Sequence, residues 1–542
     1  MSRFAYVFSL FAVVALALLL RLPNLAHRPM HNDEGVNTVK FNQLWTTGHF
    51  EYDPNEYHGP TLYYFTLPVV WLSGARDFAS TTETTFRLVP VIFGVGLILL
   101  LPLVSDGIGR GGVIWAGLFT AVSPAFVYYS RYYIHEMPLV FFMFAALACG
   151  WRYRRSNHLA WAVACGVFLG LSYATKETWV LALSAAAGSA VLAATIWRLI
   201  LKHVHHGLHF RPRAVLVAGL GFIVTFILFF SGFFTSPRGP IDAVMTYFNY
   251  AHRANSDVHN HPWNYYLSIL LWWRVKGGPV WTEAAIVGLS VVGFLLAVFR
   301  KSTSRHVAGH ESHESHTHVG HPFPSFPPFV RFVGFYTLFL VIAFSIIPYK
   351  TPWCLLGFLN GMILLAGFAS AQTVHAMPGW ITKSLATAVF LAAATHLAWQ
   401  ADRATNNFTD KRHRSYFEAS RYNPYVYAHT SRDIFTLTKK IDELAAVAPE
   451  GKKMFIAVAT ADCWPIPFYL RSFPNVGYWS ALPDPTGNPD VIIGDTEISD
   501  RLTDENAKPH YVPSFFGLRP GVLLCIYIRQ DLFDALQASR AK

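Results

Sequence analysis

The segment FRLVPVIFGVGLILLLPLV, residues 86–104, carries a single charged residue and is long enough to cross the hydrocarbon core of a bilayer as a helix. Ten further segments of the 542-residue chain have the same character. The first of them is followed by Arg21-Leu22-Pro23-Asn24 instead of a small-residue cleavage site, so we interpret it as an uncleaved anchor. We predict eleven membrane-spanning helices, at residues 5–22, 86–104, 112–130, 137–151, 159–174, 178–200, 214–234, 281–299, 331–348, 354–371 and 381–399.

The composition supports this interpretation over the whole chain. Apolar residues make up 53% of the sequence and charged residues 14%, and the mean hydropathy is +0.31. These values exclude a disordered chain, a coiled coil, a disulfide-stapled secreted domain and a typical cytosolic enzyme. The net charge of +11 comes largely from short basic segments between apolar runs, so it reports membrane topology and not nucleic-acid binding.

The basic loops predict an orientation. With the N-terminus in the cytoplasm, Lys and Arg are about twice as dense in the inner loops as in the outer loops. Eleven spans then place the C-terminus outside a multi-pass protein of the cytoplasmic membrane. Carboxylates gather in the outer loops. Acidic residues contribute little to membrane orientation, so orientation does not explain this concentration, and we look for a chemical role.

The chain divides into two predicted domains. Residues 1–400 form an all-α polytopic membrane domain, and residues 401–542 form a small extracytoplasmic α/β domain with a helix and three strands. Within the first domain we expect three notable loops: an outer loop at 23–85 with surface helices at 35–48 and 60–73, an outer loop at 235–280, and a His-rich cytoplasmic loop at 300–330. We interpret the His-rich loop as a low-complexity linker that binds metal only adventitiously. In the second domain the helix is predicted at 430–448 and the strands at 454–460, 490–495 and 521–528.

Two adjacent carboxylates follow the first span, in His31-Asn32-Asp33-Glu34-Gly35. The structural interpretation is a helix start, in which Asn32 or Asp33 caps the helix and Glu34 favours its dipole. The functional interpretation is that one carboxylate is a general base toward an acceptor hydroxyl, while the other fixes that base or a metal.

Four further outer turns carry ionisable residues between apolar segments. They contain His58, then Arg131 with His135 and Glu136, then Lys176 with Glu177, and finally Lys350. Ordinary explanations are a helix cap at His58, an Arg–Glu pair that closes two helices, and lysines that snorkel to the interface. Together, however, cations facing a carboxylate pair resemble an anion site beside a base. Transfer of a sugar from a lipid phosphate needs such an arrangement.

These motifs resemble those of the C-type glycosyltransferase superfamily of integral membrane enzymes, GT-C. The chain is most similar to the protein O-mannosyltransferase and aminoarabinose-transferase branch, and within it to the prokaryotic flippase-activity-associated glycosylation family. The shared pieces are HNDEG at 31–35, HGP at 58–60, SRYYIHEMPL at 130–139, ATKETW at 174–179, PYKTPW at 348–353 and DCWPIPFYLR at 462–471.

The resemblance implies a site. Its acidic motif maps onto Asp33 as the base, with Glu34 as its partner. His58, Arg131, Lys176 and Lys350 would bind the donor phosphate, supported by the residues His31, His135, Glu136 and Glu177.

The resemblance also implies a reaction. The donor would be a polyprenyl-phosphate-linked sugar, and the acceptor a hydroxyl of a protein, lipid or glycan at the outer face. The sequence identifies no required cofactor and leaves the metal unknown, since cationic side chains or a divalent cation could stabilise the phosphate. Two alternatives stay open: a flippase or transporter of the lipid-linked sugar, and a noncatalytic assembly factor for glycosylation.

Overall fold

The structure is a computed structural model. It describes residues 1–55, 58–201, 211–253, 259–299, 328–406, 409–410, 415–416, 422–483, 487–498, 502 and 509–541. Most of the His-rich loop predicted at 300–330 therefore lies outside the described residues.

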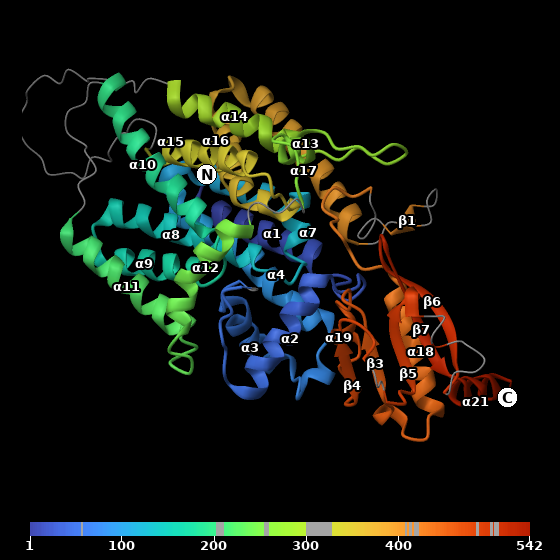
Figure 1. The fold of residues 1–542 in the computed structure, drawn as a ribbon. Helices are drawn as coiled ribbons and strands as arrows, with labels where there is room; N and C mark the ends of the chain where they lie inside the picture. Colours follow the sequence, from blue (N-terminus) through green and yellow to red (C-terminus); the bar gives the residue numbers. More distant parts are fainter. Residues whose placement is uncertain are drawn as a thin grey trace, which may run out of the picture.

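All eleven predicted spans coincide with helical structure (Figure 1). Among the described residues, six helical segments are long and apolar enough to cross a membrane by length and composition, and four shorter helices are also apolar. The helices at the predicted spans are α1 (Arg3–Arg21), α4 (Glu83–Leu100), α6 (Arg110–Val122) with α7 (Pro124–Tyr129), α8 (Glu136–Ser156), α9 (Leu159–Tyr173), α10 (Trp179–Leu201), α11 (Pro212–Phe230), α14 (Ala284–Phe299), α15 (Pro328–Ile346), α16 (Leu356–Ala376) and α17 (Gly379–Thr405).

Glycines let several of these helices approach closely. At Gly166 in α9, an added Cβ would lie 1.9 Å from the carbonyl oxygen of Ala218 in α11. At Gly293 in α14, it would lie 2.3 Å from the carbonyl oxygen of Leu365 in α16. Small residues at helix contacts are typical of membrane bundles, in which packing replaces the hydrophobic effect as the force between helices.

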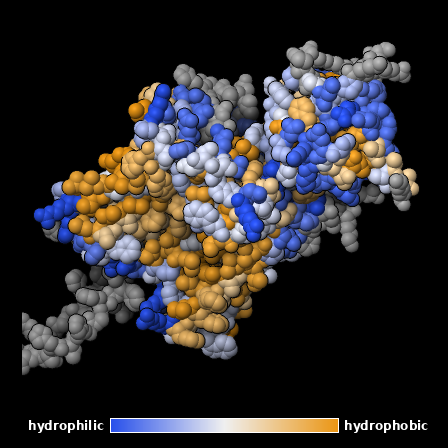
Figure 2. All heavy atoms as spheres, turned by 90° about the horizontal axis from the view of Figure 1, so that it is seen from below, coloured by the Kyte–Doolittle hydropathy of each residue, from blue (hydrophilic) through white to orange (hydrophobic). Residues whose placement is uncertain are grey.

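The bundle presents apolar side chains to its surroundings. Exposed apolar residues follow the outer faces of α11 and α17, including Leu216, Val224, Ile381 and Val389. In Figure 2 the helical part carries broad hydrophobic areas, whereas the C-terminal domain at the right is mostly hydrophilic. Together with the apolar helices, this surface is that of a multi-pass membrane protein.

Four shorter helices lie in loops between the spanning segments. The segments predicted as surface helices at 35–48 and 60–73 are helical, as α2 (Asn32–Thr47) and α3 (Thr61–Ser73), and they lie side by side at one end of the bundle, here called the loop end (Figure 1). The long loop predicted at 235–280 contains α12 (Gly239–Arg253) and α13 (Tyr265–Leu271). The remaining short elements are α5 (Ser105–Ile108), β1 (Thr409–Asp410) and β2 (Ser415–Tyr416).

The C-terminal domain is built on a five-stranded sheet in the order β4-β3-β5-β7-β6. The helix and the three strands predicted for it are confirmed as α18, β3, β5 and β7, while β4 and β6 were not predicted. In the sheet β3 is parallel to β4 and β5, and β7 is antiparallel to β5 and β6. The elements are α18 (Asp433–Val447), β3 (Ile456–Ala459), α19 (Ile466–Tyr469), β4 (Val476–Trp479), β5 (Val491–Asp495), β6 (Tyr511–Arg519), β7 (Val522–Arg529) and α21 (Gln530–Arg540).

The C-terminal domain rests on the loop end of the bundle through α19, which packs against α2 (Figure 1). The backbone N–H of Met30 donates a hydrogen bond of 2.8 Å to the Tyr469 hydroxyl. Gly35 lies so close to Pro465 that an added Cβ would be 2.7 Å from the proline Cβ. The domain therefore contacts the first turn of α2, which carries the acidic motif.

Candidate active site

The first turn of α2 separates the two carboxylates of the acidic motif. Successive residues of an α-helix point about 100° apart, so neighbours cannot share one direction. His31 is the N-cap: its Nδ1 accepts a hydrogen bond of 3.0 Å from the backbone N–H of Asp33. Glu34 completes the capping box by accepting the N–H of His31 at 2.9 Å. The helix start thus buries Glu34 and leaves Asp33 at the surface.

Glu34 is fully buried and its charge is neutralised inside the protein. Both of its oxygens accept hydrogen bonds from Arg87, at 2.8 and 2.6 Å, and Arg28 lies 3.5 Å away. The N–H of Tyr133 adds a bond of 2.9 Å. Burial alone would raise the pKa of Glu34, but the two arginines and these hydrogen bonds lower it to about 2. Glu34 therefore ties α2 to α4 and does not reach the surface beside Asp33.

Asp33 keeps an accessible carboxylate, because 42% of its side chain is exposed. Its nearest polar partners are the Asn32 amide at 3.3 Å and the His31 ring at 3.9 Å. The negative charge of Asp33 also acts on Tyr132 and Tyr349: burial raises the pKa of both phenols, and Asp33 raises it further. The carboxylate consequently lies close to the turns that hold these two tyrosines.

The hydrogen bonds of His31 hold Asp33 in place and define which ring nitrogen of His31 carries the proton. Because Nδ1 accepts the Asp33 N–H, the proton sits on Nε2, which donates a hydrogen bond of 2.8 Å to the carbonyl of Tyr427. The ring is 3% exposed, and burial lowers the pKa of His31. A neutral imidazole thus links the helix start to the segment that leads into the C-terminal domain.

A second group of predicted residues meets next to α3. The Nδ1 of His58 donates a hydrogen bond of 2.8 Å to Oε2 of Glu177, and 32% of the His58 side chain stays exposed. The His135 ring lies 5.1 Å from the His58 ring, and its Nε2 contacts the Gly59 carbonyl at 3.1 Å. Burial lowers the pKa of His135 well below its ordinary value. These residues come from three distant parts of the chain, and the fold brings them together.

Gly59 makes this convergence sterically feasible. Its N–H donates a hydrogen bond of 3.0 Å to the carbonyl of Thr175, and an added Cβ would lie 2.1 Å from the carbonyl oxygen of Ala174. Only glycine allows the HGP turn to approach the 174–178 turn this closely.

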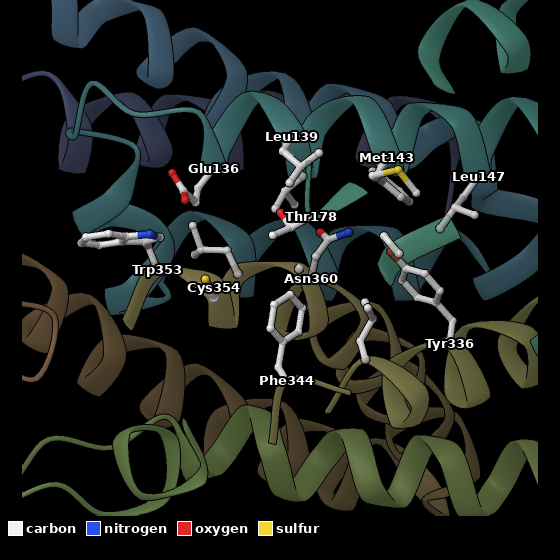
Figure 3. A pocket seen from close by; sticks show the side chains of 16 residues that line it. Glu136, Leu139, Met143, Leu147, Thr178, Tyr336, Phe344, Trp353, Cys354 and Asn360 are labelled. Atoms are coloured by element: carbon white, nitrogen blue, oxygen red, sulfur yellow. The ribbon is translucent and has the colours of Figure 1, made fainter. Parts of the chain in front are cut away.

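Lys176 and Glu136 form a buried ion pair in the same region, with 10% and 7% of their side chains exposed. The pair lies at one end of a groove with about 560 Å³ of empty space, bounded by α8, α10, α15 and α16. In Figure 3, Glu136 and Trp353 lie at one end of the groove, and Leu147 and Tyr336 lie at the other. Most lining residues are apolar, including Leu139, Val140, Met143, Phe144, Leu147, Ala182, Leu340, Phe344 and Leu356. A groove of this kind suits a hydrocarbon chain whose charged end stops at Lys176.

The turn PYKTPW connects the groove with Asp33. Trp353 lines the groove, and its ring lies 6.1 Å from the ring of His31. Tyr349 is 45% exposed. Burial raises the pKa of its phenol, Asp33 and Glu136 raise this pKa further, and Lys176 lowers it. The PYKTPW turn therefore lies within electrostatic range of both the accessible carboxylate and the ion pair at the groove.

Arg131 and Lys350, which the resemblance assigned to the donor phosphate, have other partners. Arg131 is 5% exposed, and its guanidinium donates to the carbonyls of Arg21 and Asn24 at 3.2 Å and to the side chain of Asn406 at 3.1 Å. It thereby joins the ends of α1 and α17. Lys350 is 1% exposed and donates to the carbonyls of His261, at 3.0 Å, and Ile347. Of the four predicted phosphate ligands, Lys176 pairs with the groove-lining Glu136, and His58 contacts Glu177 in the same turn as Lys176.

Several site residues were not predicted. No role was assigned to Arg28 and Arg87, which neutralise Glu34. His259 also had no assigned role; burial lowers its pKa, and Asp33 raises it. Arg87 was detectable in principle, because an ionisable residue inside a predicted span is expensive and needs a partner. Within the described part of the chain, no three His, Cys, Asp or Glu side chains come together in a group that could hold a metal ion.

Comparisons with known proteins agree with this architecture. Residues 61–235 match the family described as dolichyl-phosphate-mannose-protein mannosyltransferase. The crystal structure of ArnT from Cupriavidus metallidurans, bound to undecaprenyl phosphate, superposes with a TM-score of 0.62 at 14% identity, over 98% of this chain and 99% of that chain. The oligosaccharyltransferase of Archaeoglobus fulgidus superposes with a TM-score of 0.55 at 13% identity, over 98% of this chain and 77% of that chain. A comparison with curated protein sequences gives no significant match.

At these identities the structural likeness shows the fold, which is the GT-C fold with a small C-terminal sheet domain. The predicted resemblance to GT-C glycosyltransferases and the predicted fold class are confirmed.

Proposed function

We propose that the chain transfers a sugar from a polyprenyl-phosphate-linked donor to a hydroxyl of a glycan, lipid or protein. The observation that carries this proposal is the apolar groove that ends at Lys176, on the same end of the bundle as the accessible carboxylate of Asp33. The bound undecaprenyl phosphate in the ArnT structure supports the same class of donor.

The reaction needs two charges of opposite sign on either side of the sugar. Asp33 accepts the proton of the acceptor hydroxyl as its oxygen attacks the anomeric carbon. The bond between that carbon and the phosphate oxygen breaks, and the polyprenyl phosphate leaves with the electron pair. Lys176 stabilises the leaving phosphate by charge, and His58 stabilises it by hydrogen bonding. Glu136 holds Lys176 beside the groove, and Glu177 holds His58.

The two predicted residues beside Asp33 act indirectly in this proposal. His31 fixes the backbone of Asp33 through the N-cap bond, and Glu34 fixes His31 and the start of α2. They are positioning residues, since Glu34 is fully buried and His31 is 3% exposed. Arg131 and Lys350 stabilise the loop end and do not contact the phosphate.

The proposed location is the non-cytoplasmic face of the cytoplasmic membrane, with a cytoplasmic N-terminus and the C-terminal domain outside. The basic loops support this orientation. At the opposite end of the bundle, Asp106 pairs with Arg155 at 3.0 Å and with Arg152 at 3.5 Å, next to the basic end of α8. The lipid part of the donor would reach the groove from the surrounding bilayer.

A transporter of lipid-linked sugars would bind the same donor without breaking it. Such a protein is expected to carry ionisable groups along its path near the membrane midplane. In the described spans, ionisable residues lie near helix ends, as Arg87 does in α4 and Arg331 in α15. This distribution favours chemistry at the loop end.

Reconstituted protein separates the two functions. The full chain is placed in proteoliposomes with a synthetic polyprenyl-phosphate sugar labelled in the sugar and a short hydroxyl acceptor. Transfer gives labelled acceptor and free polyprenyl phosphate in equal amounts. The proposal is wrong if labelled donor crosses the bilayer intact while no polyprenyl phosphate is released. Glu51→Gln, an exposed carboxylate of the same first loop, is the matched control and should behave as wild type.

A further inference from the structure

The apolar groove also carries polar side chains, which a hydrocarbon ligand alone does not explain. The polar residues of its lining are Glu136, Thr178, Tyr336, Trp353, Cys354 and Asn360. Glu136 pairs with Lys176, and the Cys354 thiol lies 3.2 Å from the hydroxyl of Thr351. The side chains of the other four make no hydrogen bond within the part of the chain that the structure describes. The groove therefore offers polar groups that a ligand can satisfy.

Asn360 is a buried member of this set. It is 7% exposed, and it follows Leu356, the first residue of α16, by about one helical turn. In Figure 3 its amide points into the groove, between the end that holds Glu136 and the end that holds Tyr336. A buried amide that gives up its water without gaining another partner destabilises the protein. The groove therefore has to offer this amide a polar partner when a ligand fills it.

Thr178 adds a hydroxyl to the same stretch of the groove. It follows Lys176 by two residues, in the turn that leads into α10. Its backbone carbonyl accepts the N–H of Leu181 at 3.1 Å, while its hydroxyl makes no hydrogen bond among the described residues. In Figure 3 it lies, like Asn360, between Glu136 and Tyr336. Two segments far apart in the chain thus each contribute a neutral donor to the groove.

The ion pair at the groove end supplies no net charge to a ligand. Glu136 compensates Lys176, so a phosphate beside Lys176 meets a carboxylate as well as an ammonium group. Neutral N–H and O–H donors attract an anion without bringing a counter-charge, and their hydrogen bonds to a charged acceptor are stronger than those to a neutral one. Donors next to the pair are therefore what a phosphate needs in addition to Lys176.

The hydrocarbon part of a lipid cannot satisfy these donors, because an isoprenoid chain contains no oxygen or nitrogen acceptor. Covering Asn360 with hydrocarbon would remove water from its amide and give nothing in return, which opposes binding. In a polyprenyl-phosphate lipid the phosphate is the polar group attached directly to the chain. It would lie beside the two donors, and the chain would continue along Met143, Leu147 and Leu340.

We propose that Asn360 and Thr178 bind the phosphate of the lipid donor together with Lys176, and that Asn360 sets the preference of the groove for a phosphorylated lipid. The inference rests on the proposed function, because it takes the lipid-linked donor as the ligand. The Asn360 amide donates to one phosphate oxygen and the Thr178 hydroxyl to another, while Lys176 supplies the charge. Tyr336 lies at the opposite end of the groove (Figure 3), so it is not a ligand of the same phosphate.

Lipid binding to the full chain in nanodiscs tests this assignment without a transfer assay. The probes are polyprenyl phosphate and the polyprenol of the same chain length, which differ in the phosphate alone. The wild type should bind polyprenyl phosphate at least about 100-fold more tightly than polyprenol. Asn360→Leu keeps the approximate size of the side chain and removes its donors. In this variant, binding of polyprenyl phosphate should weaken at least about 10-fold, while binding of polyprenol should stay within about threefold of the wild-type value.

Two further variants complete the test. Thr178→Val removes the second donor and should also weaken polyprenyl phosphate selectively, by at least about fivefold, so it decides the question if Asn360→Leu does not fold. Ser370→Ala is the control and should bind both lipids as the wild type does. Ser370 is buried in the same helix as Asn360 but does not line the groove, and its hydroxyl donates to the carbonyl of Ala366 at 2.8 Å.

Three results would overturn the assignment. Equal affinity of the wild type and Asn360→Leu for polyprenyl phosphate removes Asn360 from the phosphate site and leaves the proposed donor in place. An equal loss for both lipids shows that Asn360 only shapes the groove. If the wild type itself does not distinguish polyprenyl phosphate from polyprenol, the proposed function fails together with this inference.

Discussion

Lys176 forms a buried ion pair with Glu136 at the point where the apolar groove between α8 and α16 begins. Neither residue could remain there alone, because a single buried charge next to hydrocarbon is unstable. Together they fix an ammonium group beside the end of the groove, where the proposed function places the donor phosphate.

A double-mutant cycle separates the structural and functional roles of this pair. Lys176→Met leaves Glu136 buried without its cation and should destabilise the fold by about 3–5 kcal/mol. Lys176→Met combined with Glu136→Leu should recover most of that stability, yet both variants should bind donor at least about 30-fold more weakly, which corresponds to about 2 kcal/mol. Thermal unfolding and donor binding in nanodiscs measure the two effects. Recovery of donor binding in the double variant would contradict a role of Lys176 in phosphate binding.

Gly59 should tolerate no side chain. In Gly59→Ala the new Cβ would lie 2.1 Å from a backbone oxygen, so the HGP turn must move and the His58–Glu177 pair must separate. We expect loss of transfer activity and a lower melting temperature. The matched control is Gly288→Ala in α14, where an added Cβ meets no atom within 4 Å and alanine favours the helix. Equal behaviour of the two variants would show that the close approach at Gly59 is unimportant.

Arg131 should affect stability without affecting donor recognition. Arg131→Gln removes charged hydrogen bonds to carbonyls at the ends of α1 and α17, which should cost about 1.5–3 kcal/mol of unfolding free energy. The KM for the lipid donor should stay within twofold of the wild-type value. A large rise in KM with unchanged stability would restore the phosphate-binding role that the motif resemblance implies.

The lowered pKa of Glu34 should make the folded protein less stable in acid. Its pKa is lowered from 4.5 to about 2 in the folded protein, because Arg87 and Arg28 outweigh the effect of burial. A lowered pKa stabilises the fold above pH 4.5, and this contribution is lost as the pH falls toward 2; it amounts to about 3 kcal/mol. Melting temperatures of the wild type should therefore decline through this window. Glu34→Gln should be less stable at neutral pH and should decline less steeply in acid; parallel curves would contradict the assignment.

The spans and loop helices were predictable, because apolar length and capping residues act locally. The orientation of neighbouring charges was not. Asp33 and Glu34 are adjacent in the sequence, yet the geometry of α2 exposes one and buries the other against Arg87, more than 50 residues away.

The different surroundings of Arg131 and Lys176 could not be predicted from the sequence either. Each stands in a short turn between apolar helices, and the sequence gives both the same chemical meaning. Tertiary packing distinguishes them, because the carbonyls at the ends of α1 and α17 surround Arg131, while Glu136 and the groove surround Lys176. The strands β4 and β6 were not predicted. Both lie at edges of the sheet, and β4 has four residues.

In the proposed reaction, Asp33 takes the acceptor proton next to a donor held by Lys176. Asp33→Asn preserves the size of the side chain and its polar contacts, so the variant should fold and bind the polyprenyl-phosphate sugar with wild-type affinity. Single-turnover transfer from the bound donor should therefore fall at least about a thousandfold in this variant. Transfer by Asp33→Asn at a rate near that of the wild type, with equal donor occupancy, would contradict a role of Asp33 as the base.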